Sequence, residues 1–248
     1  MGLGGTFEGN IYDWQEHYDL SKNVKSNGSP GLNSKSINDY VKKPKASDIS
    51  TPRFLSQFIY DKIKDIPNFN KEGIILDICC KEGVLSLPFK ESGYEVIGID
   101  NKDYSKEFHS QFIQCDFLEQ IKSIKDLPIR KPELILINPP WNNPKRLYEK
   151  AYLPALFLKH IFKIFGKDIK LVLLTSYTLL ENTTIHSDGK VSDRYRYLES
   201  ISEHITGILE QPLNSFKGVK LWNNTIFFNI ENINPVMFIP QIYFDKYL

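Results

Sequence analysis

Five short apolar runs, rich in β-branched residues, recur along the middle of the chain, and helical stretches separate some of them. The runs cover residues 73–80, 94–100, 110–118, 133–141 and 169–177. Strands that are apolar along their whole length are typical of sheets covered on both faces, and alternation with helices is typical of parallel sheets. The sequence therefore predicts an α/β fold built on a parallel sheet with helices on both faces.

Two helices stand out around these runs. Residues 50–66 have Ser50 or Thr51 as an N-terminal cap, Pro52 in the first turn, and apolar residues at helical spacing. These features predict a capped amphipathic helix. Residues 144–165, between the fourth and fifth runs, form the most prominent of the other helical stretches.

The C-terminal part of the chain departs from this alternation. Residues 204–210 and 219–230 read as two strands joined by a turn. An antiparallel hairpin at the edge of the parallel sheet is the most economical arrangement for them. The expected fold class is therefore α/β, with a Rossmann-like, seven-stranded, mostly parallel sheet, an antiparallel C-terminal hairpin, and helices on both faces.

Residues 1–50 have the composition of an arm rather than of a folded domain. Residues 21–36 are rich in Ser, Asn, Gly and Lys, which favours loop or disorder. Residues 22–53 hold seven basic and two acidic residues, and residues 142–170 hold the same numbers. Each basic segment fits either a phosphate-facing patch or a solvated face. We therefore expect a partly disordered basic arm followed by one folded domain over residues 51–248.

The overall composition excludes few classes of protein. The 248 residues are 41% hydrophobic and 25% charged, as in soluble globular proteins, and the net charge of +1 neither favours nor excludes nucleic acid as a partner. Three cysteines do not make a disulfide framework, and no apolar run reaches about 18 residues. We therefore expect a cytoplasmic protein with no membrane partner. The five histidines lack ligand spacing, so no metal site is indicated.

Acidic residues stand at or near the ends of three apolar runs, where an open parallel sheet binds its ligands. Asp100 is placed to accept hydrogen bonds from both hydroxyls of a ribose, and it follows Asp77 by one strand. The loop between them has one glycine, Gly83, where a pyrophosphate cradle needs three. A ribose-bearing cofactor without phosphates fits better, and S-adenosylmethionine is such a molecule. Asp116 can then accept from the adenine amine, and Phe117 can lie against the ring.

The fourth apolar run ends in the corner Asn138-Pro139-Pro140-Trp141. Prolines are poor strand residues and hold such a turn rigid. The side-chain oxygen of Asn138 and the carbonyl of Pro139 can accept both hydrogens of an exocyclic base amine, which aims the nitrogen lone pair at an electrophile. Trp141 supplies a face on which the base can stack.

With these motifs in this order, residues 50–230 resemble the class I S-adenosylmethionine-dependent methyltransferases. Among them they are similar to the adenine-N6 DNA methyltransferases with an Asn-Pro-Pro-aromatic motif, of the kind found in bacterial restriction-modification systems. Residues 51–59 (TPRFLSQFI) resemble the helix before the cofactor site, and residues 75–86 (ILDICCKEGVLS) resemble the first strand and its loop. The resemblance implies methyl transfer from S-adenosylmethionine to the N6 amine of an adenine that is flipped out of DNA.

The resemblance also implies three sets of site residues. The expected catalytic residues are Asn138, Pro139, Pro140 and Trp141. The expected cofactor-binding residues are Thr51, Asp77, Cys79, Gly83, Asp100, Asn101, Asp116, Phe117 and Asn138. The expected substrate-binding residues are Trp141 and Phe216, which would sandwich the base, with Trp222 as the second choice for that role.

Two features depart from the pattern of that family. Lys81 stands where the family has its first loop glycine, and no separate target-recognition domain of about 100 residues follows. Residues 1–50 and 181–194 would have to hold the substrate, with a recognition subunit or a second copy of the chain as a further partner. Three alternatives stay open: an RNA adenine-N6 methyltransferase, a protein glutamine methyltransferase, and a non-catalytic subunit with the methyltransferase fold.

Overall fold

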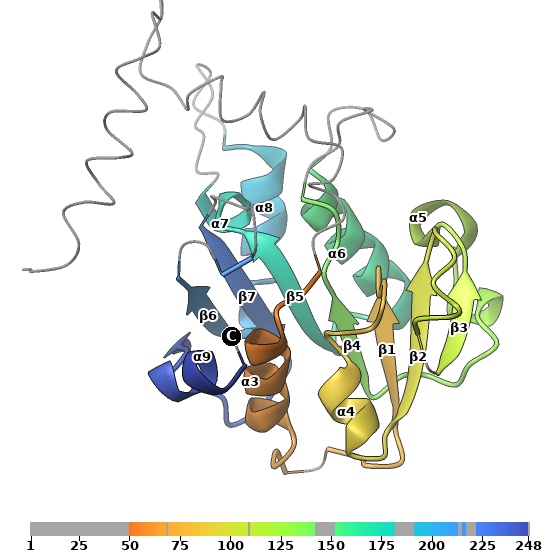
Figure 1. Ribbon diagram of the computed structural model, residues 1–248. Helices are drawn as coiled ribbons and strands as arrows, with labels where there is room; N and C mark the ends of the chain where they lie inside the picture. Colours follow the sequence, from red (N-terminus) through yellow and green to blue (C-terminus); the bar gives the residue numbers. More distant parts are fainter. Residues whose placement is uncertain are drawn as a thin grey trace, which may run out of the picture. The chain divides into compact units, whose positions relative to one another are not determined.

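The computed structural model describes most of the domain expected over residues 51–248 (Figure 1). The described residues are 50–67, 69–108, 110–141, 152–181, 191–212, 215–216 and 222–247. The predicted arm, apart from Ser50, lies outside the described residues, and so do residues 182–190 of the predicted substrate loop.

Eight strands form one sheet. They are β1 (Ile74–Ile78), β2 (Glu95–Asp100), β3 (Gln111–Gln114), β4 (Leu134–Ile137), β5 (Lys170–Ser176), β6 (Ile205–Gln211), β7 (Asn223–Phe228) and β8 (Val236–Phe238). Their order across the sheet is β3-β2-β1-β4-β5-β7-β6-β8. The first five strands in this order are parallel, whereas β7 lies between β5 and β6 and is antiparallel to both. The expected α/β class, with a mostly parallel sheet and an antiparallel C-terminal hairpin, is therefore confirmed.

The sheet has one strand more than the seven expected. β8 pairs in parallel with β6, and its three residues are exposed, buried and exposed in turn. A strand this short, with only one inward-facing side chain, does not produce the apolar run by which the other strands are visible in the sequence.

Helices cover both faces of the sheet (Figure 1). They are α3 (Arg53–Ile63), α4 (Leu87–Glu91), α5 (Phe117–Gln120), α6 (Leu153–Phe165), α7 (Thr178–Glu181), α8 (Asp193–Glu199) and α9 (Gln241–Tyr247), with the short 3-10 helices η2 (Ile124–Asp126) and η3 (Ser202–His204). α6 matches the described part of the helix expected over residues 144–165. Among the described residues, no helix combines the length and apolar character needed to cross a membrane.

The two faces of the sheet have separate apolar layers. On one face, Phe157 of α6 belongs to the same buried cluster as Leu171 of β5 and Phe228 of β7. On the other face, α3 packs against α9, where the ring centroids of Phe54 and Phe244 are 4.8 Å apart. Because successive strand residues point to opposite faces, these layers show which face each polar side chain shares with its neighbours.

The start of α3 corrects one prediction. The helix begins at Arg53 with Pro52 in the N-cap position, and no side chain caps it. The hydroxyls of Ser50 and Thr51, expected to be caps, instead bond to Glu82 and Asn138. The prediction was wrong because a capping hydroxyl bonds within its own helix, whereas these two bond to loops that only the sheet brings close.

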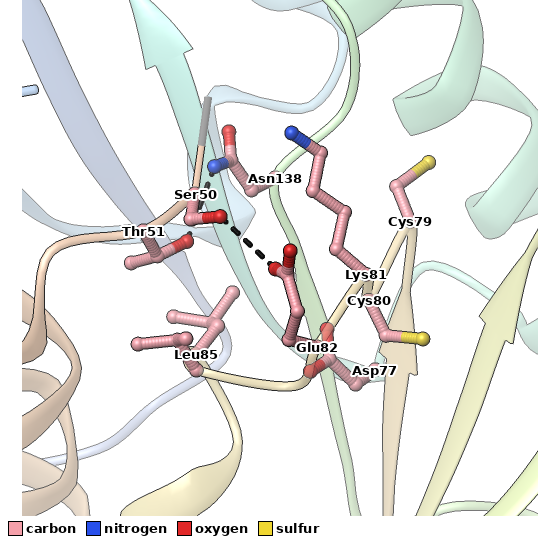
Figure 2. A pocket seen from close by; sticks show the side chains of 10 residues that line it. Ser50, Thr51, Asp77, Cys79, Cys80, Lys81, Glu82, Leu85 and Asn138 are labelled. Carbon is pink, nitrogen blue, oxygen red and sulfur yellow. Dashed lines mark hydrogen bonds between the residues drawn. The ribbon is translucent and has the colours of Figure 1, made fainter. Parts of the chain in front are cut away.

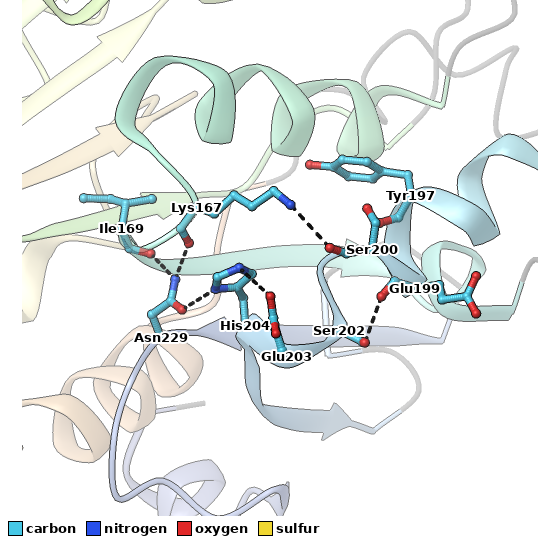
Figure 3. A network of polar contacts seen from close by, with 9 residues as sticks. All are labelled: Lys167, Ile169, Tyr197, Glu199, Ser200, Ser202, Glu203, His204 and Asn229. Carbon is cyan, nitrogen blue, oxygen red and sulfur yellow. Dashed lines mark hydrogen bonds and ion pairs between the residues drawn. The ribbon is translucent and has the colours of Figure 1, made fainter.

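At the amino end of β5, a polar network joins three segments of the chain (Figure 3). Asn229 has a positive φ of 55°, and its Nδ2 donates to the carbonyls of Lys167 and Ile169 at 2.6 and 2.8 Å. Its Oδ1 lies 2.9 Å from Nδ1 of His204, just before β6. One side chain after β7 therefore ties the turn before β5 to the start of β6.

Candidate functional site

The strand order reverses between β1 and β4, because β2 and β3 lie on one side of β1, and β4 and β5 on the other. In open α/β sheets, ligands bind beyond the carboxyl ends of the strands at such a reversal. A pocket with an empty volume of about 280 Å³, open solvent included, lies at this place (Figure 2). It is lined by Ser50, Thr51, Asp77, Cys79, Cys80, Lys81, Glu82, Val84, Leu85 and Asn138.

Asp77 is the buried carboxylate of this pocket. It lies in β1, 1% exposed, and its Oδ2 accepts a hydrogen bond of 2.6 Å from the hydroxyl of Ser86. Its Oδ1 is buried and has no hydrogen-bond partner among the described residues. Burial, with a smaller contribution from the charge of Asp100, raises the pKa of Asp77 to about 7. The pocket therefore contains an acceptor that a ligand can complete.

The loop after β1 is bent by three residues with positive φ, namely Cys79 at 59°, Lys81 at 47° and Gly83 at 78°. At Gly83, a Cβ would lie 2.6 Å from the ring of Phe108, so only glycine fits. Of the two expected cofactor-binding residues in this loop, Cys79 lines the pocket, whereas Gly83 shapes the loop behind it. The side chain of Lys81 extends from the loop into the pocket (Figure 2).

Asp100, at the carboxyl end of β2, holds this loop in place. Its Oδ2 accepts from the backbone N–H of Lys81 at 3.2 Å, and its Oδ1 accepts from that of Lys102 at 3.0 Å. Asp100 does not line the pocket itself, and Asn101 is exposed just beyond it. The structure therefore joins Asp100 to the pocket through the backbone of Lys81.

Asp116 and Phe117 lie at the carboxyl end of β3. Asp116 is the N-cap of α5, and its Oδ1 accepts from the backbone N–H groups of Leu118 and Glu119. Phe117 is 4% exposed, and its ring is stacked on that of Phe157 at a centroid distance of 6.2 Å. The capping role of Asp116 and the core position of Phe117 are features that the sequence reasoning did not anticipate.

Asn138 follows β4 directly and lines the pocket together with Asp77. Its Nδ2 donates a hydrogen bond of 3.1 Å to the hydroxyl of Thr51, which is 8% exposed. Figure 2 shows the carboxamide oxygen on the side away from Thr51. Pro139 is buried, and Pro140 is half-buried. The corner thus places the carboxamide of Asn138 at the pocket.

Two predicted substrate residues come together beyond this corner. The ring centroids of Trp141 and Phe216 are 5.0 Å apart at an interplanar angle of 80°, an edge-to-face pair. Phe216 is fully buried, and Trp141 is half-buried. Trp222 is 56% exposed and contributes its carbonyl to a hydrogen bond from the backbone of Tyr177. Of the two choices for a partner to Trp141, the structure brings Phe216 into contact, but the rings meet directly and edge to face, which leaves no space between them for the expected sandwich of a base.

Sequence reasoning missed three polar residues of the site. The hydroxyl of Ser86 donates a hydrogen bond to one carboxylate oxygen of Asp77. The hydroxyl of Ser50 donates to Glu82 at 3.0 Å, and both of these residues line the pocket. Glu82 and Ser86 belong to the stretch 75–86, whose resemblance assigned them no role, and Ser50 was expected only as a helix cap. Their roles depend on contacts between segments nine and 32 positions apart.

Searches with protein-family models and among curated proteins each found no match for this sequence. Solved structures do match. A putative class I S-adenosylmethionine-dependent methyltransferase from Listeria monocytogenes is 13% identical with a TM-score of 0.56, over 83% of this chain and 72% of that one. The methyltransferase subunit of a type I restriction-modification system from Streptococcus thermophilus is 14% identical with a TM-score of 0.53, over 82% and 49%.

The M protein of the type I restriction enzyme EcoKI is 15% identical with a TM-score of 0.50, over 75% of this chain and 45% of that one. The chain thus spans about half the length of these two type I subunits. At such low identity, the likeness concerns the arrangement of strands and helices, and the chemistry has to be argued from this chain's own residues.

Proposed function

Because the chain has the fold of the class I S-adenosylmethionine-dependent methyltransferases, we propose that it transfers a methyl group from S-adenosylmethionine to the N6 amine of adenine in nucleic acid, with DNA preferred. The observation that carries the proposal is that Asn138 and Asp77 line one pocket at the strand-order reversal. We further propose that it acts in a restriction-modification system, because methyltransferase subunits of type I systems are among the proteins of similar fold.

The residues of the pocket fit this cofactor. The unpartnered Oδ1 of Asp77 can accept from its amino group, and Thr51 and Cys79 also line the pocket. The proposal also assigns Asp100 and Asn101, beyond the pocket, to the ribose and Asp116 to the adenine end. Phe117, expected to lie against the adenine ring, instead belongs to the buried cluster under α6. When bound, S-adenosylmethionine supplies an electrophilic methyl group carried by a sulfonium.

The amine of adenine is a weak nucleophile because its lone pair is delocalised into the ring. The Oδ1 of Asn138 and the carbonyl of Pro139 accept its two hydrogens, which favours a tetrahedral nitrogen with an available lone pair. The bond from Asn138 Nδ2 to Thr51 keeps the oxygen, rather than the nitrogen, directed at the amine. The nitrogen becomes acidic only as it gains the methyl group, so its proton leaves to water without a strong base.

The Trp141–Phe216 pair supports a substrate with a flat ring. Trp141 would stack on the base, and Phe216 holds the indole from its edge in a fully buried position. A nucleobase offers a larger ring for this contact than the glutamine side chain of a protein substrate does.

One observation favours a second function, that of a non-catalytic subunit. The side chain of Lys81 lies in the pocket, where it occupies space that the cofactor would need (Figure 2). Calorimetric titration with S-adenosylmethionine separates the two functions, because a subunit that has lost the cofactor gives no heat of binding.

The deciding experiment offers labelled S-adenosylmethionine with duplex DNA, single-stranded DNA, RNA and protein in parallel. Label on N6-methyladenine after nucleoside digestion is the expected result, with DNA the best substrate. Label in RNA alone would show that the substrate is RNA rather than DNA. Label on glutamine would show that the substrate is a protein and would overturn the proposal of a nucleobase. Asn138→Ala serves as the matched inactive variant, so that a contaminating methyltransferase is recognised.

A further inference from the structure

Three buried amide side chains, two at the start of β7 and one at the end of the neighbouring strand β6, carry polar atoms that form no hydrogen bond among the described residues. Asn223, Asn224 and Gln211 are 1%, 2% and 2% exposed. Both side-chain atoms of Asn223, the Nδ2 of Asn224 and the Oε1 of Gln211 have no hydrogen-bond partner among the described residues. A buried polar group without a partner destabilises a fold, so three of them at one end of a sheet need an explanation.

Two of these amides lie in one row at the level of a strand end. Ser176, the last residue of β5, pairs with Asn223, and Asn223 pairs with Gln211 in β6. The Nε2 of Gln211 donates to the hydroxyl of Thr225 at 2.7 Å, which places Gln211 on the same face as Thr225 and therefore as Asn223.

The side chain of Asn138 lies on the same face of the sheet as those of Asn223 and Gln211. Ile137 belongs to the layer under α6, so Asn138 follows on the opposite face, where it contacts Thr51 beside α3. Ile226 also belongs to the α6 layer, and Asn224 shares its face because the two are two residues apart. Asn223 therefore shares the face of Asn138, whereas Asn224 points to the other side.

The separation suits two side chains that bind neighbouring atoms on one edge of a ring. Ile137 pairs with Leu173, so Asn138 lies at the level of Leu174, two residues before Ser176. Two strand spacings and two residues of rise put the Cα atoms of Asn138 and Asn223 about 12 Å apart. Asparagine side chains that lean toward each other over that distance can bring both amides to one edge of the same planar heterocycle.

We propose that Asn223, supported by Gln211, reads the target base: its Nδ2 donates to a ring nitrogen of the adenine whose amine is held by Asn138 and Pro139. This inference rests on the function proposed above and extends it to the choice of base. Adenine presents its amine beside an unprotonated ring nitrogen on either side, N1 and N7, and an asparagine amide matches such an edge. The unpaired amide of Asn223 is then the group that the base completes, whereas that of Asn224 lies on the other face.

Asn223→Leu tests the proposal, with Asn224→Leu as the matched control on the same strand and the opposite face. Because each change replaces an unpaired buried amide by an apolar group, we expect both variants to keep or raise Tm. We expect cofactor affinity to be unchanged in both. The KM for an adenine oligonucleotide should rise about tenfold or more in Asn223→Leu only.

Modified substrates identify the contact. Wild type should discriminate about tenfold against either 1-deazaadenine or 7-deazaadenine in the oligonucleotide, and Asn223→Leu should not. Equal behaviour of the Asn223 and Asn224 variants would overturn the proposal, because both amides would then be structural. Asn223→Thr, which has a smaller side chain, repeats the test if the leucine variant does not fold.

Equilibrium binding of a single-stranded adenine oligonucleotide, followed by fluorescence anisotropy, separates this inference from the proposed reaction. Weaker binding by Asn223→Leu alone, with no methyl transfer by wild type, would overturn the reaction and keep the binding site. Methyl transfer to adenine with equal binding and equal KM for all three proteins would keep the reaction and overturn the role of Asn223.

Discussion

The carboxamide nitrogen of Asn138 donates a hydrogen bond of 3.1 Å to the hydroxyl of Thr51, which lies 87 positions earlier in the chain. This contact joins the end of β4 to the residues before α3, and both residues line the pocket that contains Asp77. With the amide in this orientation, its oxygen is left for a substrate (Figure 2). A hydroxyl that looks like a helix cap in the sequence is therefore a positioning residue of the candidate site.

Thr51→Val should lower kcat about tenfold, because the amide of Asn138 loses the partner that orients it. Single-turnover kinetics at saturating S-adenosylmethionine measures this loss separately from any change in cofactor affinity, which calorimetric titration measures. Thr51→Ser, which keeps the hydroxyl, should recover most of the rate. Equal rates for the valine and serine variants would show that the hydrogen bond has no part in turnover.

Asn138→Ala should remove most turnover and leave cofactor binding largely intact, because the lost acceptor acts mainly in the transition state. We expect a loss of about 100-fold or more in kcat, by comparison with the removal of other groups that stabilise a transition state. Single-turnover methyl transfer measures it. A variant with an unchanged rate would contradict the catalytic role of the corner.

Asp77→Asn should change how stability depends on pH. The pKa of Asp77 is about 7 in the folded protein and 3.8 in a free side chain, so the folded state binds more protons between these values. The free energy of unfolding therefore falls as pH rises, by up to about 1.4 kcal/mol per pH unit, and Asp77 contributes no stability above pH 7. The variant should lose this slope in urea unfolding from pH 4 to 8; an identical slope in both proteins would refute the shift.

Lys81→Gly should strengthen cofactor binding, because glycine adopts the φ of 47° without strain and leaves more room in the pocket. Calorimetric titration of both proteins with S-adenosylmethionine measures the change, and Lys81→Ala controls for the backbone. A rise in affinity in both variants attributes the effect to the side chain. Weaker binding in both would instead make Lys81 a ligand of the cofactor.

Asn229→Ala should destabilise the fold by about 2–4 kcal/mol, because it removes three hydrogen bonds and keeps a positive φ (Figure 3). Chemical denaturation measures the loss. Asn232→Ala is the control, since Asn232 is exposed and has a φ of 56°. Equal losses in both variants would mean that the backbone conformation, rather than the network, accounts for the effect.

The strand runs and the corner at Asn138 were visible in the sequence because they depend on local patterns. Alternating apolar segments predict a parallel sheet, and the end of such a strand is where a ligand meets it. Strand β8 was not predicted, because three residues with one buried side chain show almost no hydrophobic pattern. The hydrogen-bond partners of Asp77 and Asn138 were not predicted, because the sequence does not indicate which distant residue a hydroxyl will contact.

The sequence by itself determined the class of fold, the series of acidic strand ends and the rigid diproline turn, since each arises from residues close together in the chain. Only the tertiary structure decided that Thr51 orients Asn138, that Phe216 rather than Trp222 meets Trp141, and that Asn223 and Asn224 face opposite sides of the sheet. These outcomes depend on strand order and register, because side-chain contacts across a sheet are made between segments whose spacing in the chain carries no information about them.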